Sequence, residues 1–383
     1  MSRNGANMNP FVFGEVVKEA NFIDRKAELE AIAKDLLDCQ KVFLIAPRRY
    51  GKTSLLLAAA ERLKAKGVRV IYLDLFKTAS VEQFAAALGK AASEMRKLGF
   101  TETVNFIKDF VSGLRPQFSV NPDGSLSLGV DASPPQKEVF QMIENLLAYP
   151  QEFAIREKKP VVVMFDEFQE IVSIGGEPLE KLMRSVIQKQ RNVGYAFCGS
   201  KKTMMSEMVS KKSRAFFGMG PVTHLDKIPS EYFEKCLAAN FAKGGFDCPK
   251  ETLRSIVSSA GGIPYYIQYL AHELWDLKAE EKKITDADVT QAVALIAKRN
   301  TPLYQNLWEN LPQTQKRLLQ GLAANPGAAI FSGDFMTRHQ LKSSALVKKS
   351  LSLLVSKDII EKEGTDHVFT DYWMGVWVRQ NCS

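Results

Sequence analysis

Short runs of apolar residues alternate with amphipathic segments through the first part of the chain. Four of these runs predict buried strands, at 42–45, 68–75, 161–165 and 194–198, and a shorter strand is predicted at 224–228. Between the runs, apolar positions recur at helical spacing, which predicts helices at 26–39, 55–66, 81–98, 101–115, 136–150 and 179–190. Strands that alternate with helices are typical of a parallel sheet covered on both faces, so we expect an α/β fold.

A different pattern interrupts this alternation at 116–131. Apolar and polar residues alternate on both sides of Asp123-Gly124, which is a strong signal for a β-hairpin. The hairpin would be an insertion into the α/β domain. It is either a contact arm or an ornament on the solvent-exposed surface, and the pattern favours neither.

The rest of the chain predicts two further modules. Residues 229–300 are helical in pattern, which suggests a lid bundle. Residues 301–383 predict three helices followed by a hairpin about Gly364, which is the order of a winged helix, a variant of the helix-turn-helix. We therefore expect an α/β core over 1–228 with the inserted hairpin, a helical lid over 229–300 and a winged-helix domain over 301–383.

The first predicted strand leads into the sequence APRRYGKTS. A strand, a glycine-containing loop and a helix in this order are the context of a P-loop, whose usual pattern is G-x-x-x-x-G-K-[ST]. Gly51 would let the backbone approach a phosphate, and the first amides of the following helix would face the anion. Lys52 would reach the β- and γ-phosphates of a nucleotide, and the Thr53 hydroxyl would hold Mg²⁺.

Ala46 departs from this pattern because it occupies the position of the first glycine. A methyl group there is a small intrusion if the local φ is negative, so we expect it to be tolerated. We accordingly predict that the whole loop binds the nucleotide. Its residues are Ala46, Pro47, Arg48, Arg49, Tyr50, Gly51, Lys52, Thr53 and Ser54.

The third buried strand ends in two adjacent carboxylates, Asp166 and Glu167. The carboxyl ends of parallel strands are where α/β sheets bind ligands. Asp166 would hold the Mg²⁺ through water, and Glu167 would polarise the attacking water. Together with the P-loop upstream, this pair predicts the site of an ATPase. Glu170 needs no role beyond that of an acid at a helix start.

A short segment ahead of the first helix adds candidates for contact with the nucleotide. Phe22 and Ile23 would stack on the adenine, unless they are simply core residues. If this segment covers the base, Asp24 or Arg25 would reach the ribose or the lid. The pattern leaves the core and the adenine interpretations equally open.

Four residues farther along the chain are further candidates. Ser200 follows the fourth strand, where it would contact the γ-phosphate or its water, or else cap a helix. Arg214 lies in a basic stretch and is either a solvated residue or an arginine finger for a neighbouring subunit. Gly262 and Pro264 open a predicted lid helix, which would face the nucleotide with Pro264 on the base, or is an ordinary helix start with proline in its first turn.

Composition narrows the class of protein. Hydrophobic residues at 45% and charged residues at 25% are typical of a soluble globular protein. No run approaches the roughly 20 apolar residues of a membrane span, and the N-terminus lacks the apolar segment of a signal peptide, so we expect no membrane association. The five cysteines are scattered without CxxC spacing and the four histidines are unpaired, which favours a reducing cytoplasm over disulfides or a protein-bound metal.

The net charge of +8 and the isoelectric point near 9.0 permit a polyanionic partner and do not require one. Between 298 and 383 there are eleven lysines and arginines against seven acids. This modest excess permits DNA binding through the winged helix, with Lys348 and Lys349 on the exposed side of its third helix. The aromatic end of the chain, with Trp373 and Trp377, favours a core or interface over a surface that stacks on bases.

In this order, the segments NPFVFG, FIDRKAEL, APRRYGKTSL, VVVMFDEFQE, FCGS, GGIPYYI and TDYWMGVW resemble the archaeal-type ATPase family. That family comprises prokaryotic AAA+-like proteins near the STAND branch and the origin-recognition initiators. The resemblance covers nearly the whole chain, although the hairpin is outside the shared motifs. It implies a P-loop core of the ASCE type, a helical lid and a winged helix.

The resemblance also carries roles onto matching residues. It implies nucleotide and catalytic roles for Lys52, Thr53, Asp166 and Glu167. It matches Ser200 to a sensor-like position, and it matches the Gly-x-Pro at 262–264 to the lid motif of the family. Ala46 departs from the glycine of the motif.

These features predict a Mg²⁺-dependent ATPase that couples ATP binding and hydrolysis to a rearrangement between core, lid and winged helix. Arg214 or another basic residue would complete a site between subunits of a homo-oligomer. ATP is preferred to GTP on the resemblance, and no N-K-x-D guanine motif follows the core. A second hypothesis is a nucleotide-gated module that rarely hydrolyses ATP and holds a protein partner, such as a nuclease or toxin. A third is action on DNA through the winged helix.

Overall fold

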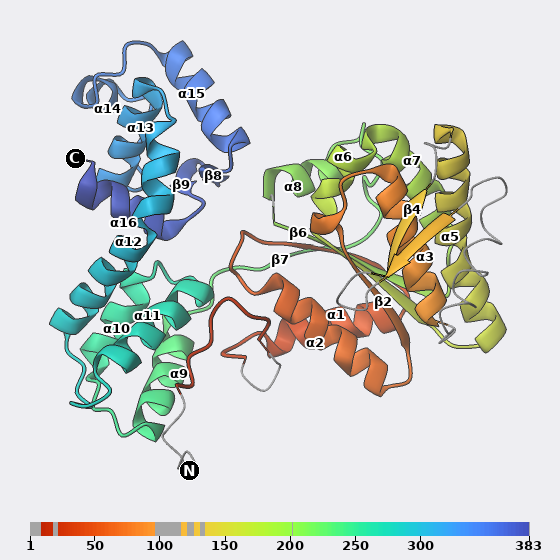
Figure 1. The fold of residues 1–383 in the computed structure, drawn as a ribbon, viewed down its shortest axis with the longest axis horizontal. Helices are drawn as coiled ribbons and strands as arrows, with labels where there is room; N and C mark the ends of the chain where they lie inside the picture. The colour runs from red at the N-terminus through yellow and green to blue at the C-terminus, as the bar shows by residue number, and fades with distance from the viewer. Residues whose placement is uncertain are drawn as a thin grey trace. The chain divides into compact units, whose positions relative to one another are not determined.

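The computed structural model describes residues 9–17, 22–95, 116–120, 126–130, 135–200 and 202–382. The chain divides into two compact units (Figure 1). One unit spans Val16–Asp226, and the other combines Met1–Glu15 with Lys227–Ser383. The chain therefore crosses between the units twice, once after residue 15 and once after residue 226.

A five-stranded parallel sheet forms the centre of the first unit, with the strand order β2-β5-β6-β1-β7. The strands are β1 (Lys41–Ile45), β2 (Arg69–Asp74), β5 (Val161–Asp166), β6 (Val193–Gly199) and β7 (Val222–His224). The first four confirm the predicted strands to within one residue at each end, and the parallel sheet confirms the α/β fold. Every residue of β5 and β6 is buried, because interior strands covered on both faces expose neither set of side chains.

Strand β7 begins and ends earlier than the prediction of 224–228. It pairs with β1 from Phe43 to Ile45, and the N–H of Leu225 still donates to the carbonyl of Ile45 at 3.0 Å. After Ile45 the chain leaves the sheet as the phosphate loop, so the residues after Leu225 have no neighbouring strand to pair with. Leu225 and Ile228 are nevertheless buried. The apolar residues at 224–228 therefore indicated burial and not a strand.

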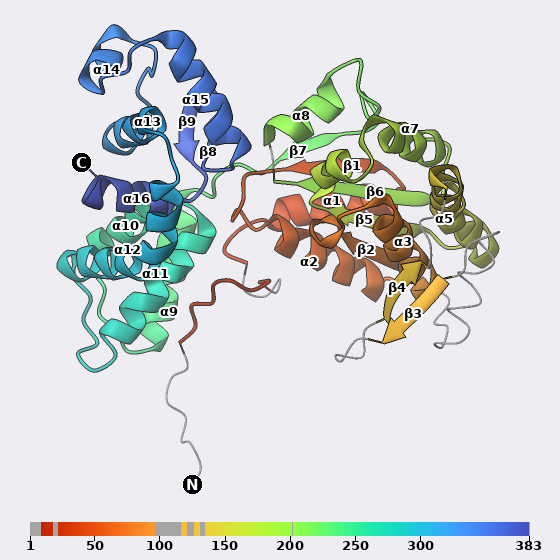
Figure 2. The ribbon, with the colours of Figure 1, turned by 45° about the horizontal axis from the view of Figure 1, so that its top comes forward.

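Helices cover both faces of the sheet (Figure 2). Helices α1 (Lys26–Leu37) and α2 (Lys52–Ala65) pack on one face, and α3 (Val81–Met95), α5 (Gln136–Glu157) and α7 (Gly176–Ile187) cover the other. Short elements complete the unit: η2 (Leu75–Lys77), η3 (Phe168–Glu170), α6 (Ile171–Ile174) and α8 (Lys202–Ser210). Helix α5 continues seven residues past the predicted end because Pro150 is accommodated inside it, in a buried position. The helix predicted at 101–115 lies outside the described residues.

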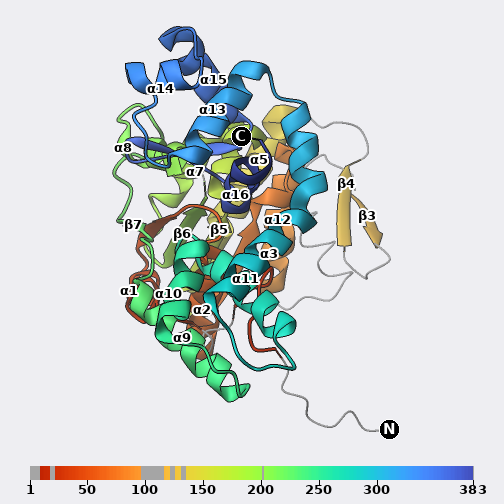
Figure 3. The same ribbon diagram turned by 90° about the vertical axis from the view of Figure 1, so that its left-hand side faces the viewer.

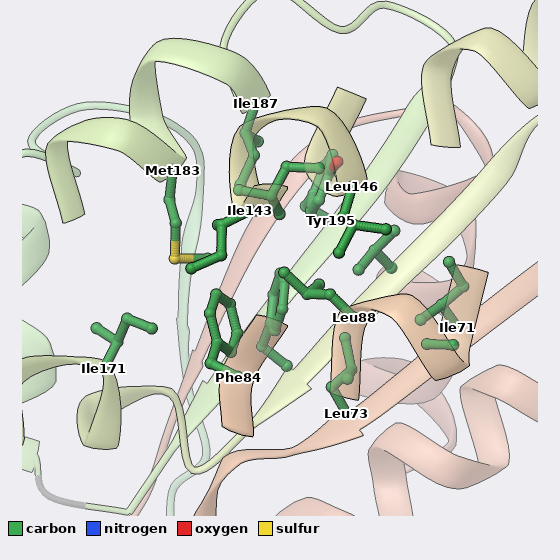
Figure 4. Close-up of a cluster of buried hydrophobic side chains, with 14 of the residues drawn as sticks. Ile71, Leu73, Phe84, Leu88, Ile143, Leu146, Ile171, Met183, Ile187 and Tyr195 are labelled. Atoms are coloured by element: carbon green, nitrogen blue, oxygen red, sulfur yellow. The ribbon is translucent and has the colours of Figure 1, made fainter. Parts of the chain in front are cut away.

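The larger hydrophobic core lies between the sheet and the helices α3, α5 and α7. Alternate residues of each strand point to this side, as the pleat of a strand requires. Phe165 and Phe197 stack at its centre with ring centroids 5.8 Å apart. Figure 4 shows apolar side chains from strands and helices that converge here, among them Ile71, Leu73, Phe84, Leu88, Ile143 and Leu146.

Tyr195 places a polar hydroxyl inside this core. Its Oη donates to Oε1 of Gln190 at 2.7 Å, and Nε2 of Gln190 donates to the carbonyl of Leu147 at 2.7 Å. Burial raises the pKa of Tyr195, which keeps the hydroxyl protonated as a donor. The relay satisfies the buried polar atoms and ties strand β6 to helix α5.

Strands β3 (Pro116–Val120) and β4 (Leu126–Val130) form the inserted hairpin (Figure 3). They pair antiparallel, with Val120 opposite Leu126, as the alternating pattern predicted. The predicted Asp-Gly turn at 121–125 lies outside the described residues. The two interpretations of the hairpin, as a contact arm or an ornament, remain predictions.

The second unit consists mainly of helices. Those in the region predicted as a lid are α9 (Ser230–Lys243), α10 (Lys250–Ser259), α11 (Pro264–Leu277) and the first part of α12 (Asp286–Glu309). They are followed by α13 (Gln313–Ala324), α14 (Gly333–Arg338), α15 (Ser344–Ser356), β8 (Ile360–Glu363), β9 (Asp366–Phe369) and α16 (Tyr372–Asn381). Three helices followed by an antiparallel hairpin is the order predicted for the winged helix.

The predicted boundary between lid and winged helix falls inside helix α12, which runs through 300–301 with Pro302 in its interior. A partly buried hydrogen bond also joins the two regions, since the Tyr266 hydroxyl donates to Oδ1 of Asp371 at 2.8 Å. Trp373 and Trp377 are buried in this unit, at 1% and 4% exposure. The two predicted modules therefore belong to one compact body.

The segment at 9–15 belongs to this second unit, whereas the sequence analysis included it in the core. Phe11 is buried against Phe241 and Trp275, with ring centroids 4.7 and 6.0 Å away. Phe13 stacks on Tyr269 at 4.2 Å. A boundary drawn along the sequence missed this packing because the segment lies far from its partners in the chain.

None of the helices in the described ranges combines the length and the apolar character needed to cross a membrane.

Candidate functional site

The loop between β1 and α2 contains two residues in the left-handed region, Arg49 with φ 70° and Gly51 with φ 84°. A Cβ on Gly51 would meet no atom within 4 Å, so the backbone conformation, and not crowding within the chain, favours glycine there. Ala46 is buried and does not have a positive φ. Its methyl group therefore causes no backbone strain, as the sequence analysis expected.

Helix α2 begins with the two residues that matter most for phosphate chemistry. Lys52 is only 5% exposed, and its ammonium donates to the carbonyl of Pro47 at 2.7 Å, across the loop. The Thr53 hydroxyl donates to Oδ2 of Asp166 at 2.7 Å. The phosphate loop and the end of β5 are therefore joined directly by a side-chain hydrogen bond.

Asp166 is buried at the carboxyl end of β5 and receives several donors. Besides Thr53, the Tyr72 hydroxyl on β2 donates to Oδ2 at 2.9 Å, and the N–H of Glu167 donates to Oδ1 at 2.9 Å. Burial and the nearby Asp166 raise the pKa of Tyr72, so its hydroxyl remains a donor. These bonds satisfy a buried carboxylate and hold both of its oxygens in place.

Glu167 has a φ of 49°, an uncommon backbone conformation for a residue with a side chain. Its Oε2 accepts hydrogen bonds from the Ser200 hydroxyl at 2.6 Å and from Nε2 of Gln169 at 2.5 Å. Oε1 of Gln169 accepts from the N–H of Ser200 at 3.2 Å, which closes a ring of three residues. Strand β6 lies between β1 and β5, so Ser200 stands between the phosphate loop and the two carboxylates.

The segment at 22–25 is anchored by Arg25, which lies in the left-handed region with φ 96° and is buried. Its guanidinium donates to Oε1 of Glu28 at 2.6 Å and to the carbonyl of Asp226. A buried guanidinium requires such partners, so these bonds give Arg25 a role within the fold. Contact of Asp24 or Arg25 with the ribose or the lid stays a prediction. Phe22 and Ile23 are half-buried, which leaves their role in stacking a prediction.

Val17, at the end of the described range 9–17, also meets the phosphate loop. Its N–H donates to Oγ of Ser54 at 3.0 Å. Asp226, the acceptor of Arg25, follows Leu225, which bonds to the last residue of β1. Val17 and Arg25 are therefore each fixed near the edge of the sheet where the phosphate loop begins.

Arg214 does not lie free on the surface. Its guanidinium bonds to both oxygens of Glu180 on α7, at 2.5 and 3.2 Å. The Glu180 side chain is 2% exposed and that of Arg214 is 27% exposed. Burial raises the pKa of Glu180 even though Arg214 lowers it. The arginine thus neutralises a buried acid of its own chain, and a role as an arginine finger would require it to leave this pair.

Replacing Arg214 with alanine is expected to lower the free energy of unfolding by roughly 1–3 kcal/mol, because Glu180 would lose its ion-pair partner in a buried position. Burial raises the pKa of Glu180 in the folded protein, so the fold favours the protonated carboxyl. That contribution to stability is lost as the pH rises and the carboxyl gives up its proton. The loss of stability caused by Arg214→Ala should therefore be larger near pH 8 than near pH 5. Urea unfolding at both values measures this. Lys211→Ala, which removes an exposed pair with Glu207, is the control. Unchanged stability at both values would contradict a structural role.

Gly262 and Pro264 belong to the second unit. Pro264 is the first residue of α11, and Gly262 has φ 70°, where a Cβ would lie 4.0 Å from Cδ of Lys227, an ordinary contact distance. A Cβ on the neighbouring Gly261 would lie 2.8 Å from the ring of Tyr372, so that glycine is needed for packing. Proline at a helix start needs no ligand, so contact of Gly262 and Pro264 with a nucleotide remains a prediction.

Tyr72 and Gln169 are the site residues that sequence reasoning missed. Tyr72 lies opposite Met164 in the pairing of β2 with β5, and this strand order was not available from the sequence. Gln169 did have a signal, since it lies in the same segment as the two carboxylates, FDEFQE. One turn of η3 after Glu167 brings its amide back onto the carboxylate.

The fold and this edge of the sheet define a P-loop nucleotide-binding protein with one strand between the P-loop strand and the acidic strand. The chain belongs to the family of ATPase domains found predominantly in Archaea, whose sequence profile matches residues 22–270. A second profile, of a probable winged-helix domain, matches residues 302–380. A search of curated protein sequences found no significant match.

Solved structures share this fold. A Walker-type ATPase of Pyrococcus abyssi matches with a TM-score of 0.64 and 17% identity, over 96% of this chain and 99% of that chain. The ORC2 protein of Aeropyrum pernix, in its ADPNP–ADP complexes, matches with 0.58 and 15% over 97% and 96%. The ORC1 protein of the same organism, in complex with DNA, matches with 0.50 and 15% over 94% of each chain. At these identities the similarity establishes the P-loop core and the winged helix as the fold.

Proposed function

We propose that the protein is a Mg²⁺-dependent ATPase. The observation that carries this proposal is the hydrogen bond of 2.7 Å between Thr53 of the phosphate loop and Asp166 of β5. It brings the two halves of a nucleotide site together, with Glu167 adjacent and Lys52 in the same helix. Membership of the ATPase family and the nucleotide-bound relative from Aeropyrum pernix support the same conclusion.

Each side chain has a chemical task in this proposal. Lys52 exchanges the carbonyl of Pro47 for phosphate oxygens, since phosphate is the better acceptor for an ammonium group. Thr53 and Asp166 would hold Mg²⁺, and their oxygens fit because hard cations prefer hydroxyl, carboxylate and water ligands. The ion would neutralise charge on the phosphates. Glu167 takes up the proton of the attacking water, while Ser200 and Gln169 orient its carboxylate.

The proposal extends to the second unit. ATP binding and hydrolysis would change how the core, the lid helices and the winged helix are arranged, and DNA or a protein would respond to that change. The DNA complex of the ORC1 relative supports DNA as one partner. A site shared between subunits of a homo-oligomer is also part of this proposal. The cysteine pattern supports a cytoplasmic protein.

One observation favours the second candidate, a nucleotide-gated module with little turnover. Oε2 of Glu167 is already occupied by two hydrogen-bond donors. An attacking water would have to compete with these two donors for the lone pairs of that oxygen. Such a protein would bind ATP and hold a protein partner, and it would hydrolyse the nucleotide rarely.

Steady-state ATP hydrolysis across a range of protein concentrations, with and without Mg²⁺ and duplex DNA, tests these alternatives. The proposal expects turnover that requires Mg²⁺ and stops on chelation. A rise steeper than linear with concentration would support sites shared between subunits. Bound ATP without turnover under every condition would overturn the ATPase proposal in favour of the gated module.

A further inference from the structure

Helix α15 is the third helix of the winged helix (Figure 1). One of its sides is buried and the other is exposed. Val347, Ser350, Leu351 and Leu354 face the interior of the unit. The third helix is the element that such folds present to a nucleic acid. The chemistry of its exposed side therefore indicates what this module can bind.

Two leucines form a ridge along that exposed side. Leu346 and Leu353 are 40% and 42% exposed and are seven residues apart, so they lie on the same side of the helix two turns apart. Ala345, Ser352 and Ser356, all exposed, add only small side chains beside them. The ridge is apolar surface that a partner can cover, and covering it is favourable by the hydrophobic effect.

The same helix is poorly equipped to recognise DNA bases. Arginine, asparagine and glutamine bind base edges through pairs of hydrogen bonds, and arginine and histidine can stack on bases. The sequence from Ser344 to Ser356 contains none of these four residue types. Lys348 and Lys349 are its only charged residues. These two lysines can bind phosphates. The two exposed leucines have neither a charge nor a hydrogen-bond donor with which to bind a phosphate backbone.

The adjacent wing has the wrong charge for DNA. Strands β8 and β9 carry Glu361, Glu363 and Asp366 against a single lysine, Lys362. Burial and that lysine lower the pKa of His367, so the imidazole adds no positive charge near neutral pH. An acidic wing repels the phosphate backbone that a winged helix must approach.

The charges around the leucine ridge are all positive. Lys342 and Lys357 flank the two ends of α15, and no acidic residue occurs from 342 to 357. Lys349 lies beside both leucines, three residues after Leu346 and four before Leu353, whereas Lys348 lies farther round the helix, near the exposed Val355. All four lysines are exposed. An apolar ridge surrounded by positive charge is complementary to an apolar ridge surrounded by negative charge.

We propose that the exposed side of α15 is a docking surface for an acidic, amphipathic segment of a protein partner, and that it does not read DNA. The leucines would pack on the apolar face of that segment, and the lysines would pair with its carboxylates. A second copy of α15 is excluded as the occupant of this surface, because lysines would then face lysines. The proposal is separate from the ATPase chemistry and does not depend on turnover.

Fluorescence anisotropy on the full chain tests the proposal with two labelled probes. One probe is a synthetic amphipathic helix with leucines on one face and glutamates beside them, and the other is a DNA duplex. The variants are Leu346→Ser with Leu353→Ser, and Lys348→Glu with Lys349→Glu. Leu303→Ser is the matched control, because Leu303 is an exposed leucine on α12 of the same unit, at 58% exposure.

The proposal expects the acidic peptide to bind, and each double variant to weaken binding by about tenfold or more while the control leaves it unchanged. Raising the salt concentration should weaken peptide binding only in part, because the leucine contact is apolar. Three results would overturn it: no binding of the peptide, an equal loss in the control, or duplex binding that the lysine variant weakens and the leucine variant does not. Thermal melting of each variant shows whether it is folded.

Discussion

Alanine in place of Lys52 is expected to remove nearly all ATP binding and turnover. The ammonium is buried at the start of α2 and lies across the phosphate loop, on the carbonyl of Pro47. A phosphate in the loop would replace that carbonyl and gain a charge-assisted hydrogen bond. A loss of about 3 kcal/mol, at the upper end for hydrogen bonds to charged groups, corresponds to more than a hundredfold in Kd.

Lys64→Ala is the matched control for this prediction. Lys64 lies on the same helix, is 53% exposed and pairs only along the helix surface, with Glu61 at 2.9 Å. Isothermal titration calorimetry with ATP, together with steady-state hydrolysis, compares the two variants. If Lys52→Ala binds ATP as tightly as the control, the loop at 46–54 is not the phosphate site. Urea unfolding separates this result from a loss of fold.

Much of the core could be predicted because its apolar runs are continuous. Strands buried on both faces have to be apolar, as β6, nearly all of β1 and β5 up to Phe165 are. The edge strand β2 is buried only at Ile71 and Leu73, and its apolar run was still found to within one residue. The P-loop segment and the segment with Asp166 and Glu167 could also be recognised in the sequence, because each lies at the carboxyl end of a predicted strand. The parallel order of the strands then brings those ends to one edge of the sheet.

The features that the sequence did not reveal share a physical cause, which is packing between parts of the chain that are far apart in sequence. Phe11 has the same local pattern whether it packs on the core or on Phe241, more than two hundred residues away. Arg214 looked like a solvated cation because its acid, Glu180, is on another helix. Helix α12 crosses a predicted domain boundary because both of its halves find buried neighbours.

The N-terminal segment at 9–17 is an example of such packing that involves the proposed nucleotide site. Phe11 is held in the second unit, and six residues later the N–H of Val17 bonds to Ser54 in the first turn of α2. The segment is therefore attached at one end to the helical unit and at the other to the helix that begins with Lys52. The crossing after residue 226 starts beside Arg25. Val17 and Asp226 are thus both fixed within the first unit, the one by Ser54 and the other by Arg25.

Glutamine in place of Glu167 is expected to lower the turnover number by roughly a hundred- to ten-thousandfold and to leave ATP binding close to normal, because the change removes only the proton acceptor. The amide keeps the size of the carboxylate. Its oxygen can still accept from Ser200 and from Gln169, which hold Oε2 at 2.6 and 2.5 Å in the native protein. The backbone at this position, with φ 49°, faces no new steric demand.

Glu170→Gln supplies the comparison that makes this result specific. Glu170 is the next acid along the chain, and its Oε2 accepts from the Ser173 hydroxyl at 3.2 Å. Its Oε1 accepts from Nε2 of Gln169 at 3.5 Å, which is long beside the 2.5 Å from the same amide to Glu167, so Glu170 lies at the margin of the ring. Single-turnover hydrolysis and ATP titration on the two variants separate chemistry from binding. A drop in Glu167→Gln alone assigns the proton transfer to Glu167. If the native protein already turns over as slowly as this variant, the ring that holds Glu167 prevents catalysis, and the protein is a nucleotide-gated module whose partner would have to release that carboxylate.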